Sequence, residues 1–256
     1  MAIGVFGDSF ADRYLHPALK EMGWVDESWM QYLEDQGHRV KSYGLTSAST
    51  WYAFEQFLYF HKYMDRIVFV YSHHSRIHSM PESYNIFSSF ATRPIESLTE
   101  SPAYRDRSSE DQENIMTIVK GANLTFNHAF NLFVQHKVFE EVNKICREKK
   151  IKLVNVFPFD DIRSIRDYDL KSAHGDCLYD LLPVVYKEMD VLGVDPRSCH
   201  LSLENNTILG KFIAESFNSS SPKNINLSKE VNFVYSEEIT NRYQDRYNLM
   251  EANQWT

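Results

Sequence analysis

The sequence predicts an α/β domain in which helices cover a parallel β-sheet, and three observations support this prediction. Short apolar runs alternate along the chain with segments of helical periodicity, which is typical of strands connected by helices. The run at residues 67–71 is continuous, β-branched and aromatic, as expected of a central strand buried on both faces. A length of 256 residues allows a large core, so we expect one domain with insertions.

The individual elements follow from the same pattern. We expect strands at residues 3–6, 38–43, 67–71 and 151–157. The first helix has Asp26 or Ser28 as its cap and turns Trp29 and Leu33 inward. Further helices are expected over residues 51–64, 134–150 and 208–217, where apolar side chains recur at helical spacing.

Three segments depart from this rhythm. Residues 82–112 and 158–199 are polar and irregular, and we expect them to be insertions that roof one edge of the sheet. After residue 218 the chain becomes polar. We therefore expect a domain at residues 1–218 and a C-terminal extension outside the core at residues 219–256.

Composition and charge exclude several classes of function. The net charge is −8 with no stripe of Lys or Arg, so we expect no nucleic-acid partner. No apolar run reaches the length of a membrane span, and no membrane partner is expected. The N-terminus lacks the features of a signal peptide, and the three cysteines have no paired spacing. These features predict reduced thiols and a cytoplasmic location.

The strongest motif is Gly7-Asp8-Ser9-Phe10, directly after the first expected strand. In an open parallel sheet, ligands bind beyond the carboxyl ends of the strands, which is where Ser9 falls. Ser9 would there offer a nucleophilic hydroxyl and, through its own N–H, one donor to an oxyanion. The alternative is that Asp8 and Ser9 only cap a following helix.

A second motif lies far along the chain, at Asp195-Pro196-Arg197-Ser198-Cys199-His200-Leu201-Ser202. It immediately precedes the last expected helix. A neutral histidine at such a junction can accept the proton of Ser9, and a nearby carboxylate can orient its ring. The alternative is a surface histidine in a loop. We favour His200 as the base.

Together with Tyr43-Gly44-Leu45-Thr46-Ser47, these motifs resemble three blocks of the SGNH/GDSL hydrolase family, in the same order, across about residues 2–217. The resemblance implies a three-layer α/β/α fold with a flavodoxin-like parallel sheet. It implies Ser9 as nucleophile, His200 as base and an aspartate to orient it, without a metal or organic cofactor. It also implies a backbone oxyanion donor from the turn between Gly44 and Ser47.

The chain departs from the family pattern at three places. Ser47 stands nearest the position of the family's oxyanion glycine, and the segment after the third strand lacks the family's asparagine, reading Tyr71-Ser72-His73-His74-Ser75-Arg76. Loss of one oxyanion donor lowers kcat by about 10²–10³-fold. His73, His74 or Ser72 is expected to replace that donor. The acid is displaced too, because Asp195 lies five residues before His200 instead of three.

Other polar residues near these strand ends have two interpretations. His74 and His78 are four residues apart and, with His73 and Asp8, suggest a metal site. No H-E-x-x-H motif is present, and a polar loop that contacts substrate is the better interpretation. We expect Asp8, Ser72 and Arg76 to bind substrate and expect no metal.

The sequence thus predicts a serine esterase that acts on a small acyl group, such as acetyl on a carbohydrate. The alternative is a weakly active or inactive SGNH-like module with a binding or structural role, similar to domains of viral or phage-encoded proteins and therefore virion-associated. In either case the C-terminal extension is the expected place for self-association or for an assembly partner.

Overall fold

Six parallel strands form one sheet in the described part of the computed structural model, in the order β2-β1-β3-β4-β5-β6. The structure describes residues 2–13, 28–45, 48–73, 76, 105, 107–125, 128–159, 174–181, 183–185, 188, 201–230 and 241. The strands are β1 (Ala2–Gly7), β2 (Arg39–Gly44), β3 (Arg66–Val70), β4 (Lys152–Phe157), β5 (Asp176–Tyr179) and β6 (Asn224–Asn226).

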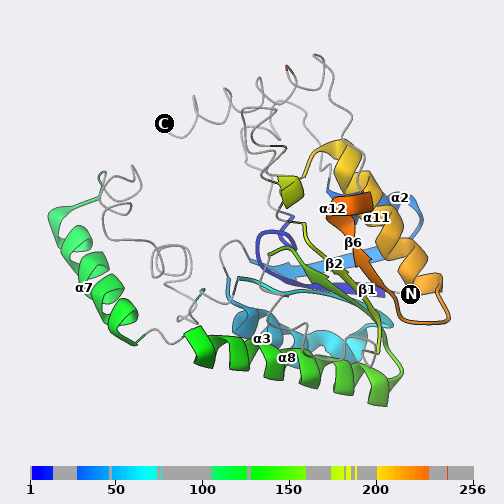
Figure 1. Ribbon diagram of the computed structural model, residues 1–256, viewed down its shortest axis with the longest axis horizontal. Helices are drawn as coiled ribbons and strands as arrows, with labels where there is room; N and C mark the ends of the chain where they lie inside the picture. Colours follow the sequence, from blue (N-terminus) through cyan, green and yellow to red (C-terminus); the bar gives the residue numbers. More distant parts are fainter. Residues whose placement is uncertain are drawn as a thin grey trace.

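Helices cover both faces of this sheet (Figure 1). The described helices are α2 (Trp29–Asp35), α3 (Thr50–Phe60), the 3-10 helix η1 (His61–Tyr63), α7 (Ser109–Thr125), α8 (His128–Lys149), α11 (Leu203–Asn218) and α12 (Leu227–Glu230). In Figure 1, α3 and α8 lie below the sheet and α2 and α11 above it, while α7 lies away from the sheet. The predicted flavodoxin-like, three-layer α/β/α fold is confirmed.

The core consists of two clusters because successive strand side chains point to opposite faces of the sheet. Ile3 and Val5 pack with Trp29 and Ile213 on the face of α2 and α11. Phe6, the residue after Val5, points to the opposite face and packs against α3 and α8. Ile67 to Val70 of β3 are fully buried, as expected of a central strand covered on both faces.

Serine side chains cap three of the helices that pack on the sheet. Ser28 Oγ accepts a hydrogen bond from Gln31 N (3.3 Å), so Ser28 is the cap of α2, and Trp29 and Leu33 are buried as predicted. Ser49 caps α3 through Tyr52 N, and Ser202 caps α11 through Asn205 N. Each cap satisfies an N–H group that the first helical turn leaves unpaired.

The structure differs from the sequence-based expectation in three elements. Helix α3 ends at Phe60 and does not reach residue 64 as expected. The 3-10 helix η1 then turns the chain, and Met64 packs in the core before β3. Leu58 is 44% exposed. Strand β5 lies within residues 158–199, where only an irregular insertion was expected. Strand β6 pairs with β5, and Leu227 is buried in the core, so residues 224–227 do not lie outside it.

The strand order determines where a ligand can bind. β1 pairs with β2 on one side and with β3 on the other, so the chain changes direction across the sheet at the β1–β3 pair. At such a switch point the loops from the carboxyl ends of the two strands diverge and leave a crevice. The segments that follow Gly7 and Val70 therefore border the expected site.

Candidate functional site

Ser9 lies at this switch point, in a tight turn after β1. Ala11 N donates to Asp8 O (2.9 Å) and Asp12 N donates to Ser9 O (3.4 Å), which closes the turn. Ser9 is partly exposed. Within the described residues, neither its N–H nor its hydroxyl makes a hydrogen bond. No described residue therefore competes with a ligand for a hydrogen bond to either group.

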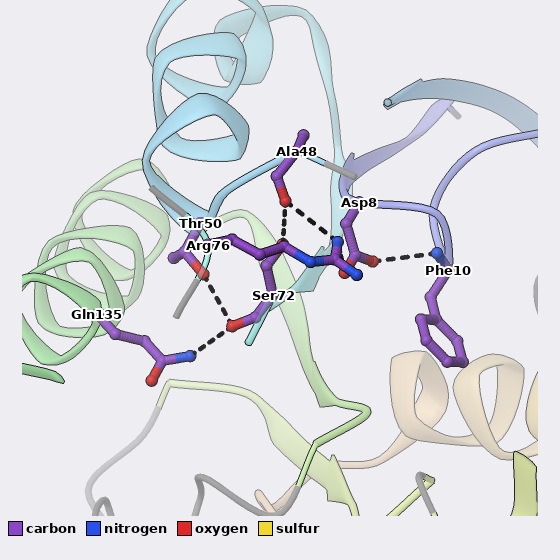
Figure 2. Close-up of polar contacts among 7 residues, drawn as sticks. All are labelled: Asp8, Phe10, Ala48, Thr50, Ser72, Arg76 and Gln135. Atoms are coloured by element: carbon purple, nitrogen blue, oxygen red, sulfur yellow. Dashed lines mark hydrogen bonds and ion pairs between the residues drawn. The ribbon is translucent and has the colours of Figure 1, made fainter. Parts of the chain in front are cut away.

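A buried ion pair joins this turn to the loop after β3 (Figure 2). Asp8 is fully buried; its Oδ1 accepts from Phe10 N (3.0 Å) and its Oδ2 from Arg76 Nη1 (2.7 Å). A buried carboxylate needs such partners because its removal from water is unfavourable. The pair fixes the loops after β1 and β3 relative to each other.

A third loop, between β2 and α3, is attached at the same place (Figure 2). Ala48 O accepts from Ser72 Oγ (2.7 Å) and from Arg76 Nη1 (3.3 Å). Ser72 O in turn accepts from Thr50 Oγ1 (3.3 Å) and from Gln135 Nε2 (2.8 Å) of α8. Ser72, which is fully buried, and Arg76 thus connect the loops after β1, β2 and β3 with the first residue of α3 and with α8.

An aromatic side chain lies beside this polar cluster. The Phe159 ring, just after β4, meets the rings of Phe10 and His73 edge-on, with centroids 5.8 and 5.6 Å apart. The Arg76 guanidinium lies 5.5 Å from the same ring, within the range of a cation–π contact. Phe159 thus brings β4 to the site, and the sequence analysis missed it because a single aromatic after a strand carries no polar signal.

Three of the predicted site residues make hydrogen bonds to other groups of the protein. Asp8 and Ser72 are fully buried and bonded to protein groups, so they support the loops and are not exposed for substrate contact. Gly44 N donates to Ser42 Oγ (3.3 Å) and is not a free oxyanion donor. A Cβ at Gly44 would lie 2.3 Å from Ala11 C and O, so the residue is glycine because the turn after β1 packs directly against it.

Replacement of Gly44 by alanine is therefore expected to lower the free energy of unfolding by about 1–3 kcal/mol, as in other overpacked sites. Urea unfolding followed by circular dichroism measures this change. Gly37→Ala is the matched control: it introduces strain at φ 83° but no steric contact within 4 Å. It is expected to lower stability by about 1 kcal/mol. Wild-type stability of Gly44→Ala would contradict the close packing.

Four of the predicted site residues, Ser47, His74, Asp195 and His200, lie outside the described residues. Their places in the site remain predictions. Of the three residues expected to complete an oxyanion site after β3, Ser72 is buried and donates to Ala48 O, whereas His73 is partly exposed and its ring contacts Phe159.

The described residues contain neither a cluster that could bind a metal ion nor an accessible thiol. Among the described residues, no group of three or more His, Cys, Asp or Glu side chains is arranged to hold a metal ion; His78 lies outside them. Cys146 and Cys177 are free thiols in the core, and burial raises the pKa of each to about 12. At neutral pH these thiols are protonated and inaccessible. Cys199 lies outside the described residues.

Comparison of the chain with protein-family models, curated proteins and solved structures finds no match. No helix among the described residues is long and apolar enough to cross a membrane.

Proposed function

We propose that this chain is a serine hydrolase that cleaves a small O-acyl ester, with Ser9 as nucleophile, His200 as base and Asp195 orienting the His200 ring. The observation that supports it most is the position of Ser9. It lies at the switch point of the sheet, on a turn closed by backbone hydrogen bonds. Neither its N–H nor its hydroxyl makes a hydrogen bond to any described residue.

In the proposed reaction, Ser9 Oγ attacks the acyl carbonyl carbon while its proton passes to His200. The carbonyl oxygen becomes an oxyanion, which accepts hydrogen bonds from Ser9 N–H and from the backbone N–H of Ser47. When the C–O bond of the ester breaks, His200 returns the proton to the leaving alcohol. A water molecule, deprotonated by His200, then releases the acyl group as a carboxylic acid.

The described residues have supporting roles in this proposal. The Asp8–Arg76 pair holds the Ser9 turn against the loop after β3, so that little reorganisation is needed when the oxyanion forms. His73 is the described residue that best replaces the family's asparagine as a third donor. The Phe159 ring provides apolar surface for a short acyl chain, which is consistent with acetyl on a carbohydrate.

The test is labelling with a fluorophosphonate probe together with hydrolysis of 4-nitrophenyl acetate. Wild type is expected to react with both, and Ser9→Ala and His200→Ala are expected to lose labelling and at least about 10³-fold in kcat. Ser109→Ala, at the exposed start of α7, is the matched serine control and should behave as wild type. Equal labelling of wild type and Ser9→Ala would refute the proposal.

A weakly active or inactive SGNH-like module is the second candidate, and one observation favours it. The Gly44 N–H and the Ser72 hydroxyl, both expected to serve the oxyanion, are bonded to Ser42 and Ala48. A folded wild-type protein that neither labels nor hydrolyses the ester would support this second function, as a binding or virion-assembly module.

A further inference from the structure

Two helices hold one backbone carbonyl group just after the end of β3. Ser72 O accepts a hydrogen bond from Thr50 Oγ1 (3.3 Å), at the first residue of α3, and another from Gln135 Nε2 (2.8 Å) of α8. All three residues are buried. Neither Thr50 nor Gln135 has a part in the reaction proposed above, although both are bonded to the loop that carries His73.

The second of these hydrogen bonds is not needed to satisfy the carbonyl. One donor, Thr50, is enough to prevent the loss of stability that an unpaired buried acceptor causes. Gln135 adds a second donor, and its own Oε1 atom is buried without a hydrogen-bond partner among the described residues. Its net contribution to stability is therefore small. What two donors from two helices add is a fixed direction for the Ser72 carbonyl.

The direction of this carbonyl determines that of the next N–H group. The peptide bond between Ser72 and His73 is trans and planar, so the His73 N–H points opposite to the Ser72 C=O. In Figure 2 the Ser72 carbonyl points toward Gln135, on the side away from Asp8. The His73 N–H is therefore directed toward the side of the turn that contains Asp8 and Ser9.

Further contacts hold His73 on the side of this turn. Its carbonyl oxygen accepts from Arg76 N (3.0 Å), and its ring meets the Phe159 ring edge-on. Arg76 also pairs with Asp8, the residue before the proposed nucleophile. His73 is thus connected to α3 and α8 on one side and to the Ser9 turn on the other. Misplacement of a reacting or donor group by about 1 Å can lower a rate about 10²-fold, so these connections matter for catalysis.

We propose that Gln135 and Thr50 are positioning residues, which fix the Ser72 carbonyl and thereby aim the His73 N–H at the oxyanion that forms on the ester. This role rests on the proposed hydrolase, because His73 is the third donor of its oxyanion site. Neither side chain contacts the substrate. Both act through one peptide unit, so they stabilise the transition state and do not contribute to binding of the ester.

Hydrolysis of 4-nitrophenyl acetate by the full chain tests this role, and the rate of fluorophosphonate labelling is a second readout. Gln135→Met and Thr50→Val each remove one donor and are expected to lower kcat about tenfold, with KM changed less than about twofold. The double variant should lose about 10²-fold, as for loss of one oxyanion donor. Thr50→Ser keeps the hydroxyl donor and should keep the wild-type kcat.

Two matched controls remove the same kinds of hydrogen bond elsewhere. Gln112→Met removes side-chain amide bonds to the carbonyls of Arg105 and Arg107, and Thr207→Val removes a hydroxyl bond to Leu203 O. Both controls should keep the wild-type kcat and KM. Melting temperatures show which variants are folded at the assay temperature, and the comparison of Thr50→Val with Thr50→Ser decides if Gln135→Met is not.

The outcomes separate this role from the hydrolase itself. If wild type is active and Gln135→Met and Thr50→Val keep its kcat, the positioning role is overturned and the hydrolase stands. The same holds if Thr50→Ser loses as much activity as Thr50→Val, or if KM rises while kcat is unchanged. A folded wild-type protein that neither labels nor hydrolyses the ester would overturn both.

Discussion

Replacement of Arg76 by methionine is expected to lower the free energy of unfolding by about 3 kcal/mol, at the lower end of the range for a broken buried ion pair. The Asp8 carboxylate is fully buried and would lose the partner that neutralises it, while Arg76 itself is 20% exposed. Methionine keeps an apolar stem at this position and loses the guanidinium, including its contact with the Phe159 ring. The loss is therefore mainly that of the charge partner, and equilibrium urea unfolding measures it.

A double-mutant cycle separates the ion pair from other effects of the substitution. Asp8→Asn keeps an acceptor for Phe10 N and removes the buried charge, so the double variant Asp8→Asn/Arg76→Met should be more stable than the sum of the single losses, by about 1–3 kcal/mol. Arg13→Met is the matched control. Its pair with Glu34 (2.9 Å) is partly exposed, at 27% and 31%, and should contribute less than about 1 kcal/mol. Equal losses for Arg76→Met and Arg13→Met would show that burial of Asp8 does not matter.

The ion pair also shows what a sequence can reveal of such a site. Gly7-Asp8-Ser9 follows a clear apolar run, so its place at the end of a strand was predictable. Arg76 lies 68 residues further on, and only the parallel pairing of β1 with β3 brings the two side chains together. The sequence indicated the residue types at this edge, but not that Asp8 and Ser72 would be turned inward.

Gln135 was a residue that the sequence could have revealed. It precedes Val138 by three residues and Val142 by seven, so a polar side chain stands on the buried stripe of α8. A polar residue at such a position needs a partner, and Ser72 O is that partner. The signal was present in the helical spacing alone.

The long strands were predictable and the short ones were not, for a physical reason. β1, β3 and β4 are five or six residues long, and three or four side chains in each are apolar and buried. β5 reads Asp-Cys-Leu-Tyr and β6 reads Asn-Ile-Asn, and backbone pairing with a neighbour holds both in the sheet. A Cβ at Gly175 would lie 1.6 Å from Leu153 O, so only glycine permits this approach to β4. Such a requirement depends on contacts between distant segments.

Replacement of Glu188 by alanine is expected to lower the free energy of unfolding by about 3 kcal/mol, because it removes a buried acceptor at the start of α11. Glu188 is fully buried and accepts from Ser202 N (2.8 Å), from Ser202 Oγ (2.5 Å) and from Asn205 Nδ2. These groups would be left unsatisfied. Because Ser202 is two residues after His200, the proposed hydrolase should also lose activity in this variant. Urea unfolding and ester hydrolysis measure the two effects.

The pH dependence of stability tests the state of the same carboxyl group. Burial raises the pKa of Glu188, and the repulsion by Glu204 adds to this, while hydrogen bonds from Ser202 and Asn205 oppose it. A raised pKa means that the folded protein binds the proton more tightly than the unfolded chain. The contribution of this group to the free energy of unfolding is therefore complete below the ordinary glutamate pKa. It is lost as pH rises through the raised pKa of the folded state.

Glu188→Gln lacks this titration, so its stability relative to wild type should rise with pH across that window and then level off. Glu215→Gln on the exposed face of α11, where the side chain is 60% exposed, should show no such change. Unfolding in urea from pH 4 to pH 8 compares the three proteins. A constant difference in the free energy of unfolding between Glu188→Gln and wild type over this range would contradict a raised pKa. It would mean that the hydrogen bonds at the start of α11 fully replace the water that burial removes from the ionised carboxylate.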